Sequence, residues 1–203
     1  AFRATMERCH AAFEDVARRI VAAIAENLGA APAALLACFD GHSSYLRLNY
    51  YPVCDDPAPP DAPTMPERGE LAVHHHTDAG AVTVLLHDGR PALQVEHRGT
   101  WHTIEARPDA LVVNVGDVVQ VWSNDRYRAP LHRVLASAAH ERLSAPFFYN
   151  PSYATRFAPL PSACAGAPPR YRPIHWEAYR AGRAAGDYAD VGEEIQIAHF
   201  RLA

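Results

Sequence analysis

Seven short β-like runs fill the stretch between residues 71 and 149, and they leave few folds open to this chain. Asp88-Gly89 and Arg98-Gly99 are turn signals between such runs. Many short strands separated by turns are typical of an antiparallel barrel or sandwich, so we expect a jelly roll. The runs cover residues 71–76, 81–87, 92–97, 100–104, 110–115, 129–135 and 142–149.

Helices are expected on both sides of the β-rich stretch. Residues 5–28 carry apolar side chains every three to four positions, which predicts an amphipathic helix, and a shorter helix follows over 32–38. Residues 175–185 predict a last helix. The expected fold class is therefore mainly β with flanking helices, in a single domain over residues 1–203. Its parts are supporting helices in 1–40, a jelly-roll core in 44–150 and a C-terminal extension in 151–203.

Three segments lie outside these elements. Residues 44–51 alternate and predict one more strand, which Pro52 stops. Residues 52–69 hold six prolines and four acidic residues, which indicates a surface loop. Residues 117–124 fit either a strand or a short helix.

The composition excludes several classes of function. All 19 basic residues are arginine, which excludes lysine Schiff bases and the P-loop lysine. The net charge of −4 and the lack of a basic block argue against nucleic acid as a partner. No apolar run reaches about 18 residues, so we expect no membrane-spanning segment. The N-terminus also lacks the layout of a signal peptide.

The four cysteines are far apart in the sequence and form no CxxC motif. Scattered thiols are typical of a reducing compartment, so we expect a cytoplasmic protein without a disulfide framework. The cysteines are Cys9, Cys38, Cys54 and Cys164.

A candidate metal site lies where the first of the seven runs ends, at His76-Thr77-Asp78. Residues i and i+2 of an extended segment share a face, so the imidazole and the carboxylate converge. With a second histidine from another strand they would form the facial triad that holds ferrous iron. His132, a polar residue within an apolar run, is the best candidate. Taken alone, an HxD pair is more often a polar surface turn, and a residue such as His132 is more often a hydrogen-bonded core or surface histidine than a ligand.

Arg142 and Ser144 form a second constellation. Residues 136–140 predict a turn, so 129–135 and 142–149 would pair as a hairpin with His132 opposite Arg142. Ser144 then shares that face. A buried arginine needs an anion, and the carboxylate of a ligand could supply it. An exposed arginine without a role is the alternative.

Taken together, the HxD…H…RxS series resembles the non-haem iron(II), 2-oxoglutarate-dependent oxygenases, in the branch that includes isopenicillin N synthase. The resemblance covers residues 44–150 and implies a double-stranded β-helix, a cupin-like jelly roll. The matching stretches are residues 46–54, 76–87, 99–102, 114–117, 122–124, 131–133 and 142–148.

The resemblance implies a role for each matching residue. His76, Asp78 and His132 would bind Fe(II), and Arg142 with Ser144 would hold the distal carboxylate of 2-oxoglutarate. Two residues from 44–51 would also contact this co-substrate, namely Tyr51 and Asn49. Phe148 matches a position that faces substrate. His74, two residues from His76, is a further candidate for the pocket wall, whereas His75 is expected to point to the opposite face. The stretches 114–117 and 122–124 are interpreted as structural.

The implied function is the hydroxylation of a small organic substrate, with 2-oxoglutarate and O2 converted to succinate and CO2. An iron-dependent oxidase that does not use 2-oxoglutarate is one alternative, and a non-catalytic metal-binding jelly roll is another. Many family members carry a region before the first helix predicted here. We expect that region to be lacking and part of the substrate pocket to be lacking with it.

Overall fold

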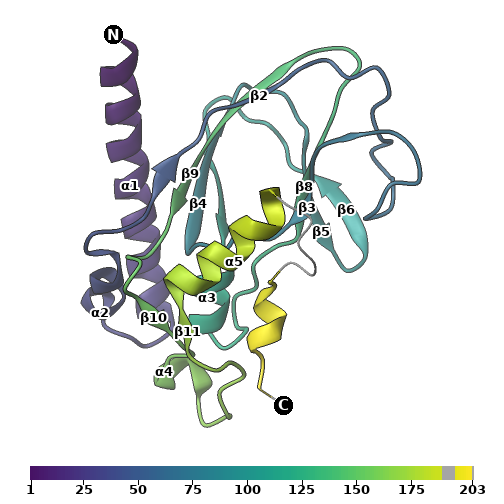
Figure 1. Cartoon of the computed structure of the whole chain (residues 1–203). Helices are drawn as coiled ribbons and strands as arrows, with labels where there is room; N and C mark the ends of the chain where they lie inside the picture. Colours follow the sequence, from purple (N-terminus) through teal and green to yellow (C-terminus); the bar gives the residue numbers. More distant parts are fainter. Residues whose placement is uncertain (189–194, 203) are drawn as a thin grey trace.

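The fold is described from a computed structural model, which covers residues 1–188 and 195–202. Figure 1 shows a long N-terminal helix beside a β-rich body, with further helices near the C-terminus. The α-helices are α1 (Phe2–Asn27), α2 (Pro32–Leu36), α3 (Asp117–Trp122), α4 (Pro161–Cys164) and α5 (Trp176–Tyr188). The two short 3-10 helices are η1 (Ala37–Phe39) and η2 (Ile197–Phe200).

The strands form two larger sheets and one short pair, with antiparallel pairing throughout their ladders. The larger sheet contains β1 (Tyr45–Leu46), β2 (Asn49–Tyr51), β4 (Val82–His87), β7 (Val112–Val115) and β9 (Arg142–Tyr149). The smaller sheet contains β3 (Leu71–His76), β5 (Leu93–His97), β6 (Thr100–Thr103) and β8 (His132–Leu135). The short pair is β10 (Arg156–Phe157) with β11 (Ile174–His175).

This arrangement confirms the expected mainly β fold with flanking helices, and most elements lie within a few residues of their predicted positions. Residues 117–124, which fitted either a strand or a short helix, contain the helix α3. The expected strand over 44–51 is divided into β1 and β2, which both pair with β9. Pro146 of β9 faces the gap between them and has no N–H to donate, which explains the break in the ladder.

The predicted hairpin between residues 129–135 and 142–149 is wrong. The strand β8 pairs with β3 and β5, whereas β9 pairs with β1, β2 and β4. Residues 136–141 therefore pass from one sheet to the other instead of closing a turn within one sheet. His132 and Arg142 are not cross-strand partners.

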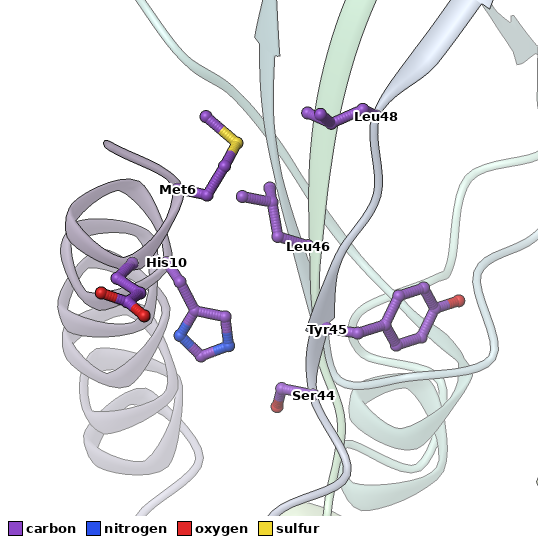
Figure 2. A pocket seen from close by; sticks show the side chains of 7 residues that line it. Met6, His10, Ser44, Tyr45, Leu46 and Leu48 are labelled. Carbon is purple, nitrogen blue, oxygen red and sulfur yellow. The ribbon is translucent and has the colours of Figure 1, made fainter. Parts of the chain in front are cut away.

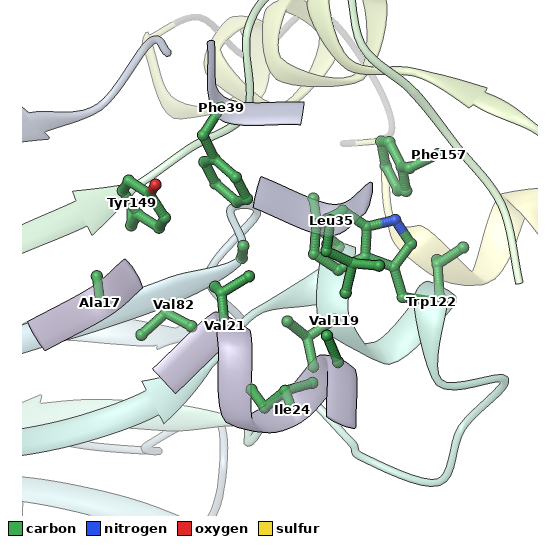
Figure 3. Close-up of a cluster of buried hydrophobic side chains, with 14 of the residues drawn as sticks. Ala17, Val21, Ile24, Leu35, Phe39, Val82, Val119, Trp122, Tyr149 and Phe157 are labelled. Atoms are coloured by element: carbon green, nitrogen blue, oxygen red, sulfur yellow. The ribbon is translucent and has the colours of Figure 1, made fainter. Parts of the chain in front are cut away.

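The core lies between α1 and the outer face of the larger sheet (Figure 3). The helix presents a stripe of small and branched side chains, and this stripe packs against β4 and β9. In addition, the Phe39 ring stacks on Tyr149 with centroids 4.0 Å apart. This packing supports the larger sheet from outside and leaves its inner face to the cavities described below. The buried contributors include Phe13, Ala17, Val21, Ile24, Val82, Val84 and Phe147.

The proline-rich loop is held against the smaller sheet by a fully buried arginine. Arg133 donates to the side-chain oxygen of Gln94 at 2.8 Å and to the carbonyls of Pro60, Ala62 and Pro63 at 2.8–3.3 Å. Its guanidinium also lies 4.2 Å from the centroid of the Trp101 ring. Neutral acceptors therefore compensate this buried charge, and the expected surface loop is anchored at several points.

Asp125 fastens the C-terminal segment to the end of α3. Its carboxylate accepts a 2.6 Å hydrogen bond from Tyr171 and pairs with Arg170 and Arg201 at 3.2 and 2.8 Å. Burial favours the neutral acid, but these hydrogen bonds and charges hold the pKa of Asp125 below its usual value. Within residues 1–188 and 195–202, no helix is both long and apolar enough to cross a membrane.

Candidate metal centre and co-substrate site

Three side chains from two strands and one loop converge on a single point. The possible ligand atoms of His76, Asp78 and His132 all lie within 4.8 Å of one another. The Nε2 atoms of both histidines are 3.7 Å from Oδ1 of Asp78. His76 and His132 face each other in the register of β3 and β8, so pairing within the smaller sheet sets their spacing.

The other atoms of these three side chains are already bonded. Nδ1 of His76 lies 2.8 Å from the carbonyl of His74, and Nδ1 of His132 lies 3.0 Å from that of Pro130. These contacts place the proton on Nδ1 and leave the Nε2 lone pair free for a metal. Oδ2 of Asp78 accepts from Thr83 at 2.6 Å and Asn114 at 2.7 Å, which leaves Oδ1 for the metal.

Protonation states agree with metal binding. Burial and the neighbouring His132 lower the pKa of His76, so its ring stays neutral more readily. Burial alone would raise the pKa of Asp78. The two histidines and the hydrogen bonds from Thr83 and Asn114 outweigh that effect and hold it below its usual value. Two neutral imidazoles and one carboxylate form the donor set that suits non-haem Fe(II).

The stretch 114–117, which we interpreted as structural, contacts Asp78 directly. In addition to the Asn114 bond, the backbone N–H of Asp117 donates to the Asp78 carbonyl at 2.8 Å. A Cβ on Gly116 would overlap with the carbonyl oxygens of Asp78 and Gly80. Glycine is therefore required by a close approach of two backbones, and this approach fixes the loop that carries Asp78.

The predicted co-substrate residues lie together on the inner face of the larger sheet. Asn49 is opposite Ser144 and Tyr51 is opposite Arg142 in the register of β2 and β9. Ser144 receives a 3.4 Å bond from Asn49 and donates at 3.4 Å to the Tyr51 hydroxyl. The Arg142 guanidinium lies 5.2 Å from the centroid of the Tyr51 ring. The sheet therefore brings together all four residues that the resemblance implied.

Arg142 is the unsatisfied member of this group. Its side chain is buried, yet its Nε and Nη1 atoms have no hydrogen-bond partner among the described residues. Buried polar groups are normally paired, and a buried charge without a partner is costly. A guanidinium presents N–H donors that match the oxygens of a carboxylate, and two nitrogens of Arg142 are open to such a ligand. The arrangement therefore fits a dicarboxylate such as 2-oxoglutarate, with one end at Arg142.

His87 is a polar residue of this region that sequence reasoning missed. Its Nδ1 accepts a 3.0 Å bond from the backbone of Gly89, which leaves the proton on Nε2. That Nε2 is buried and has no partner in the part of the chain that the structure describes. His87 lies opposite Ser144, and with Arg142 it lines a cavity of about 10 Å³. Side chains alternate between the two faces of β4, so His87 shares the inward face with Thr83, and this alternation could have revealed it.

Two cavities meet at the candidate metal site. One, of about 430 Å³, contains Asn49, Tyr51, Arg142 and Ser144, whereas the other, of about 520 Å³, extends toward α5. Both are lined by His76, Asp78 and Phe148.

His74 and His75 both line the second cavity. The pairing of β3 with β8 is irregular between Val73 and His76, so strict alternation does not hold. His75 therefore lines the same cavity as His74, although strict alternation had predicted that it points to the opposite face.

A third hollow, of about 540 Å³, lies between α1 and β1 (Figure 2). Met6, His10 and Leu46 line it, together with four further residues. None of the predicted site residues is among them.

The sequence matches a known family. The family model described as the 2OG-Fe(II) oxygenase superfamily matches residues 42–151. The chain belongs to this family. The predicted family is thereby confirmed, and the matched range covers nearly the same residues as the resemblance seen in the sequence.

Similar proteins support the same assignment. The chain is 35% identical to gibberellin 2-beta-dioxygenase 6 of Oryza sativa subsp. japonica over 206 residues, covering 98% of this chain and 53% of the relative. It is 33% identical to jasmonate-induced oxygenase 4 of Arabidopsis thaliana, covering 88% of this chain and 49% of the relative. The chain thus spans about half the length of these curated relatives.

Solved structures give the same result for the fold. The crystal structure of JOX2 in complex with 2OG, Fe and JA has a TM-score of 0.76 and 32% identity, covering 88% of this chain and 51% of that one. A full-length Neurospora crassa protein in complex with alpha-KG has a TM-score of 0.77 and 26% identity, covering 91% of this chain and 57% of that one. The jelly-roll expectation is confirmed by these neighbours.

Proposed function

We propose that residues 1–203 form a single catalytic domain of an iron(II)- and 2-oxoglutarate-dependent oxygenase, which hydroxylates a small organic substrate. One oxygen atom of O2 enters a substrate C–H bond as hydroxyl, and the other enters succinate as 2-oxoglutarate loses CO2. One observation carries the proposal. Three metal-ligand atoms converge beside a buried Arg142, whose Nε and Nη1 have no partner among the described residues, in one cavity.

Each residue has a defined part in this proposal. His76, Asp78 and His132 would hold Fe(II), a donor set of two imidazoles and one carboxylate that suits this ion. The metal, when bound, supplies the oxygen chemistry that amino-acid side chains lack. Arg142 and Ser144 bind the distal carboxylate and so fix the orientation of the co-substrate.

Two further pairs of residues complete the site. Tyr51 and Asn49 position Ser144, which bonds to both of them. Phe148 and His74 contribute to the wall of the substrate cavity.

The use of 2-oxoglutarate is favoured over the alternative oxidase. Two structural neighbours are described as complexes with 2OG or alpha-KG, and both cover most of this chain. The unpaired donors of Arg142 suit the same ligand. A purely structural metal site gives no account of those donors. We also propose a cytoplasmic setting, which the four free cysteines support.

A spectroscopic titration without oxygen tests the proposal. The protein with Fe(II) and 2-oxoglutarate is expected to show the weak visible absorption band of ferrous iron chelated by a 2-oxo acid. His132→Ala should abolish the band, and the exposed His97→Ala serves as the matched control. A wild-type protein that binds Fe(II) but gives no band with 2-oxoglutarate would refute the proposed co-substrate.

A further inference from the structure

The second cavity, on the α5 side of the metal site, has a strongly cationic wall. Three arginines line it, namely Arg47, Arg180 and Arg183. The single acidic residue among its described lining residues is Asp78, whose oxygens are committed to the metal site and to Thr83 and Asn114. This wall is therefore positively charged apart from the metal centre.

The three arginines differ in their bonding. Arg183 has a structural role, because it donates to the carbonyl of Thr77 at 2.8 Å and to the side chain of Gln196. Arg47 and Arg180, in contrast, form no ion pair with a carboxylate within residues 1–188 and 195–202. Two cations of this cavity therefore lack a counter-charge from the described part of the chain.

Both of these cations lie near the ring of Tyr45. Burial raises the pKa of Tyr45, while the charge of Arg180, a hydrogen bond with it and the charge of Arg47 oppose that rise. Figure 2 shows the Tyr45 ring on the opposite side of β1 from Met6 and His10. The ring therefore projects toward the inner side of the larger sheet, where it contacts Phe148 at a centroid distance of 5.0 Å.

One more group in this cavity lacks a partner. Nδ1 of His75 is buried and makes no hydrogen bond with any described residue. His75 lines the same cavity as Arg180. A buried polar atom without a partner indicates that a bound molecule or water completes its bonding.

We propose that this cavity binds a small organic carboxylate as the oxygenase substrate, with its carboxylate between Arg47 and Arg180. The apolar body of the substrate lies against the rings of Tyr45 and Phe148, and one of its C–H bonds faces the metal site. This inference rests on the proposed function and names its substrate class. A neutral substrate would cover both guanidinium groups without giving them an anion, which is unfavourable.

The volume agrees with a small ligand. At about 520 Å³ the cavity falls within the range of roughly 300–1,000 Å³ that is typical of small-molecule sites. Arg142 lines the first cavity, Arg180 lines the second and Arg47 lines both, so a substrate acid held between Arg47 and Arg180 and 2-oxoglutarate held at Arg142 would use different arginines.

Matched acids and amides test this inference. The probes are phenylacetate, cyclohexylacetate and octanoate, each compared with its uncharged primary amide, and phenyl phosphate as a second anion. The full chain is loaded with Mn(II) and 2-oxoglutarate without oxygen, so that Arg142 is occupied. Calorimetric titration then gives the Kd of each probe. At least one acid is expected to bind ten times more tightly than its amide, or better.

Variants assign the effect to the two arginines. Arg180→Gln and Arg47→Gln should each reduce the acid-to-amide ratio to within threefold of one, while the Kd of 2-oxoglutarate is unchanged. That unchanged Kd also shows that the variants are folded. Arg126→Gln, an exposed arginine outside the cavity, is the control and should keep the wild-type ratio.

The outcomes separate the two proposals. If no acid binds better than its amide while 2-oxoglutarate still binds, the substrate class is wrong and the oxygenase proposal stands. Tighter binding of phenyl phosphate than of every carboxylate also overturns the carboxylate class. If the Mn(II)-loaded wild type fails to bind 2-oxoglutarate, the proposed function itself is refuted.

Discussion

Replacing Arg142 by methionine should change ligand binding and stability in opposite directions. Methionine keeps much of the length of the side chain but removes the charge and both unpaired donors. We expect Arg142→Met to weaken 2-oxoglutarate binding strongly. We also expect it to raise the free energy of unfolding of the ligand-free protein, because a buried guanidinium with two unsatisfied nitrogens is lost.

The contacts of Arg142 set the size of both effects. Two hydrogen bonds to a charged group are worth about 1.5–3 kcal/mol each, so their loss should raise the Kd of 2-oxoglutarate by roughly 10²–10⁴-fold. Each unsatisfied donor costs about 1–3 kcal/mol, so the two together cost roughly 2–6 kcal/mol. The contact with Tyr51 at 5.2 Å and the attraction to Asp88 offset about 1 kcal/mol of that cost. The ligand-free variant should therefore be more stable by roughly 1–5 kcal/mol.

Two measurements check this prediction. Calorimetric titration of the Mn(II)-loaded protein without oxygen gives the Kd of 2-oxoglutarate, and urea unfolding of the metal-free protein gives its stability. Arg90→Met is the matched control, since Arg90 also lies near Asp88 but is more exposed. A variant with unchanged Kd, or one clearly less stable than the wild type without ligand, would show that Arg142 has another partner and that the reasoning is wrong.

Three other substitutions probe the supports of the site and the fold. Thr83→Val removes the 2.6 Å bond to Asp78 and should weaken metal binding about 10–100-fold in an anaerobic Mn(II) titration; unchanged affinity would contradict the role of Thr83. Arg133→Met leaves the side-chain oxygen of Gln94 and the carbonyls of Ala62 and Pro63 without their donor and should cost about 3–5 kcal/mol in urea unfolding, whereas a loss below about 1 kcal/mol would show that the loop is anchored elsewhere. Asp125→Asn should reduce stability at pH 7. The pKa of Asp125 is lower in the folded protein, so its contribution to the free energy of unfolding is present above the unfolded pKa of about 3.9 and is lost at lower pH. Denaturation curves of the variant and the wild type should therefore converge below about pH 4.

The candidate metal ligands were predictable because they depend on local geometry and on a motif. His76 and Asp78 are two residues apart, and the order of HxD, His132, Arg142 and Ser144 matches the family. The relation between His132 and Arg142 was predicted wrongly. A plausible turn in 136–140 suggested a hairpin, but the chain crosses between sheets there. Turn signals alone cannot distinguish these connections, since both reverse the chain direction.

The residues that support the site were harder to find, since their partners are distant in sequence. Thr83 and Asn114 hold one oxygen of Asp78 from two neighbouring strands. Finding His87 required knowledge of which face of β4 is turned inward. The cationic cavity combines Arg47 from the link between β1 and β2 with Arg180 from α5, and no spacing rule joins them.

The sequence by itself determined the class of fold and two of the three candidate metal ligands, because periodicity indicates the strands and the HxD spacing places His76 and Asp78 close together. The tertiary structure decided which sheet carries which half of the site. Pairing β8 with β3 brings His132 to His76, whereas pairing β9 with β2 brings Arg142 to Tyr51. It also decided which charged groups lack an ion pair among the described residues, because burial and side-chain contacts depend on the whole packed chain. The unpaired donors of Arg142 and the cationic pair of Arg47 and Arg180 are properties of that packing.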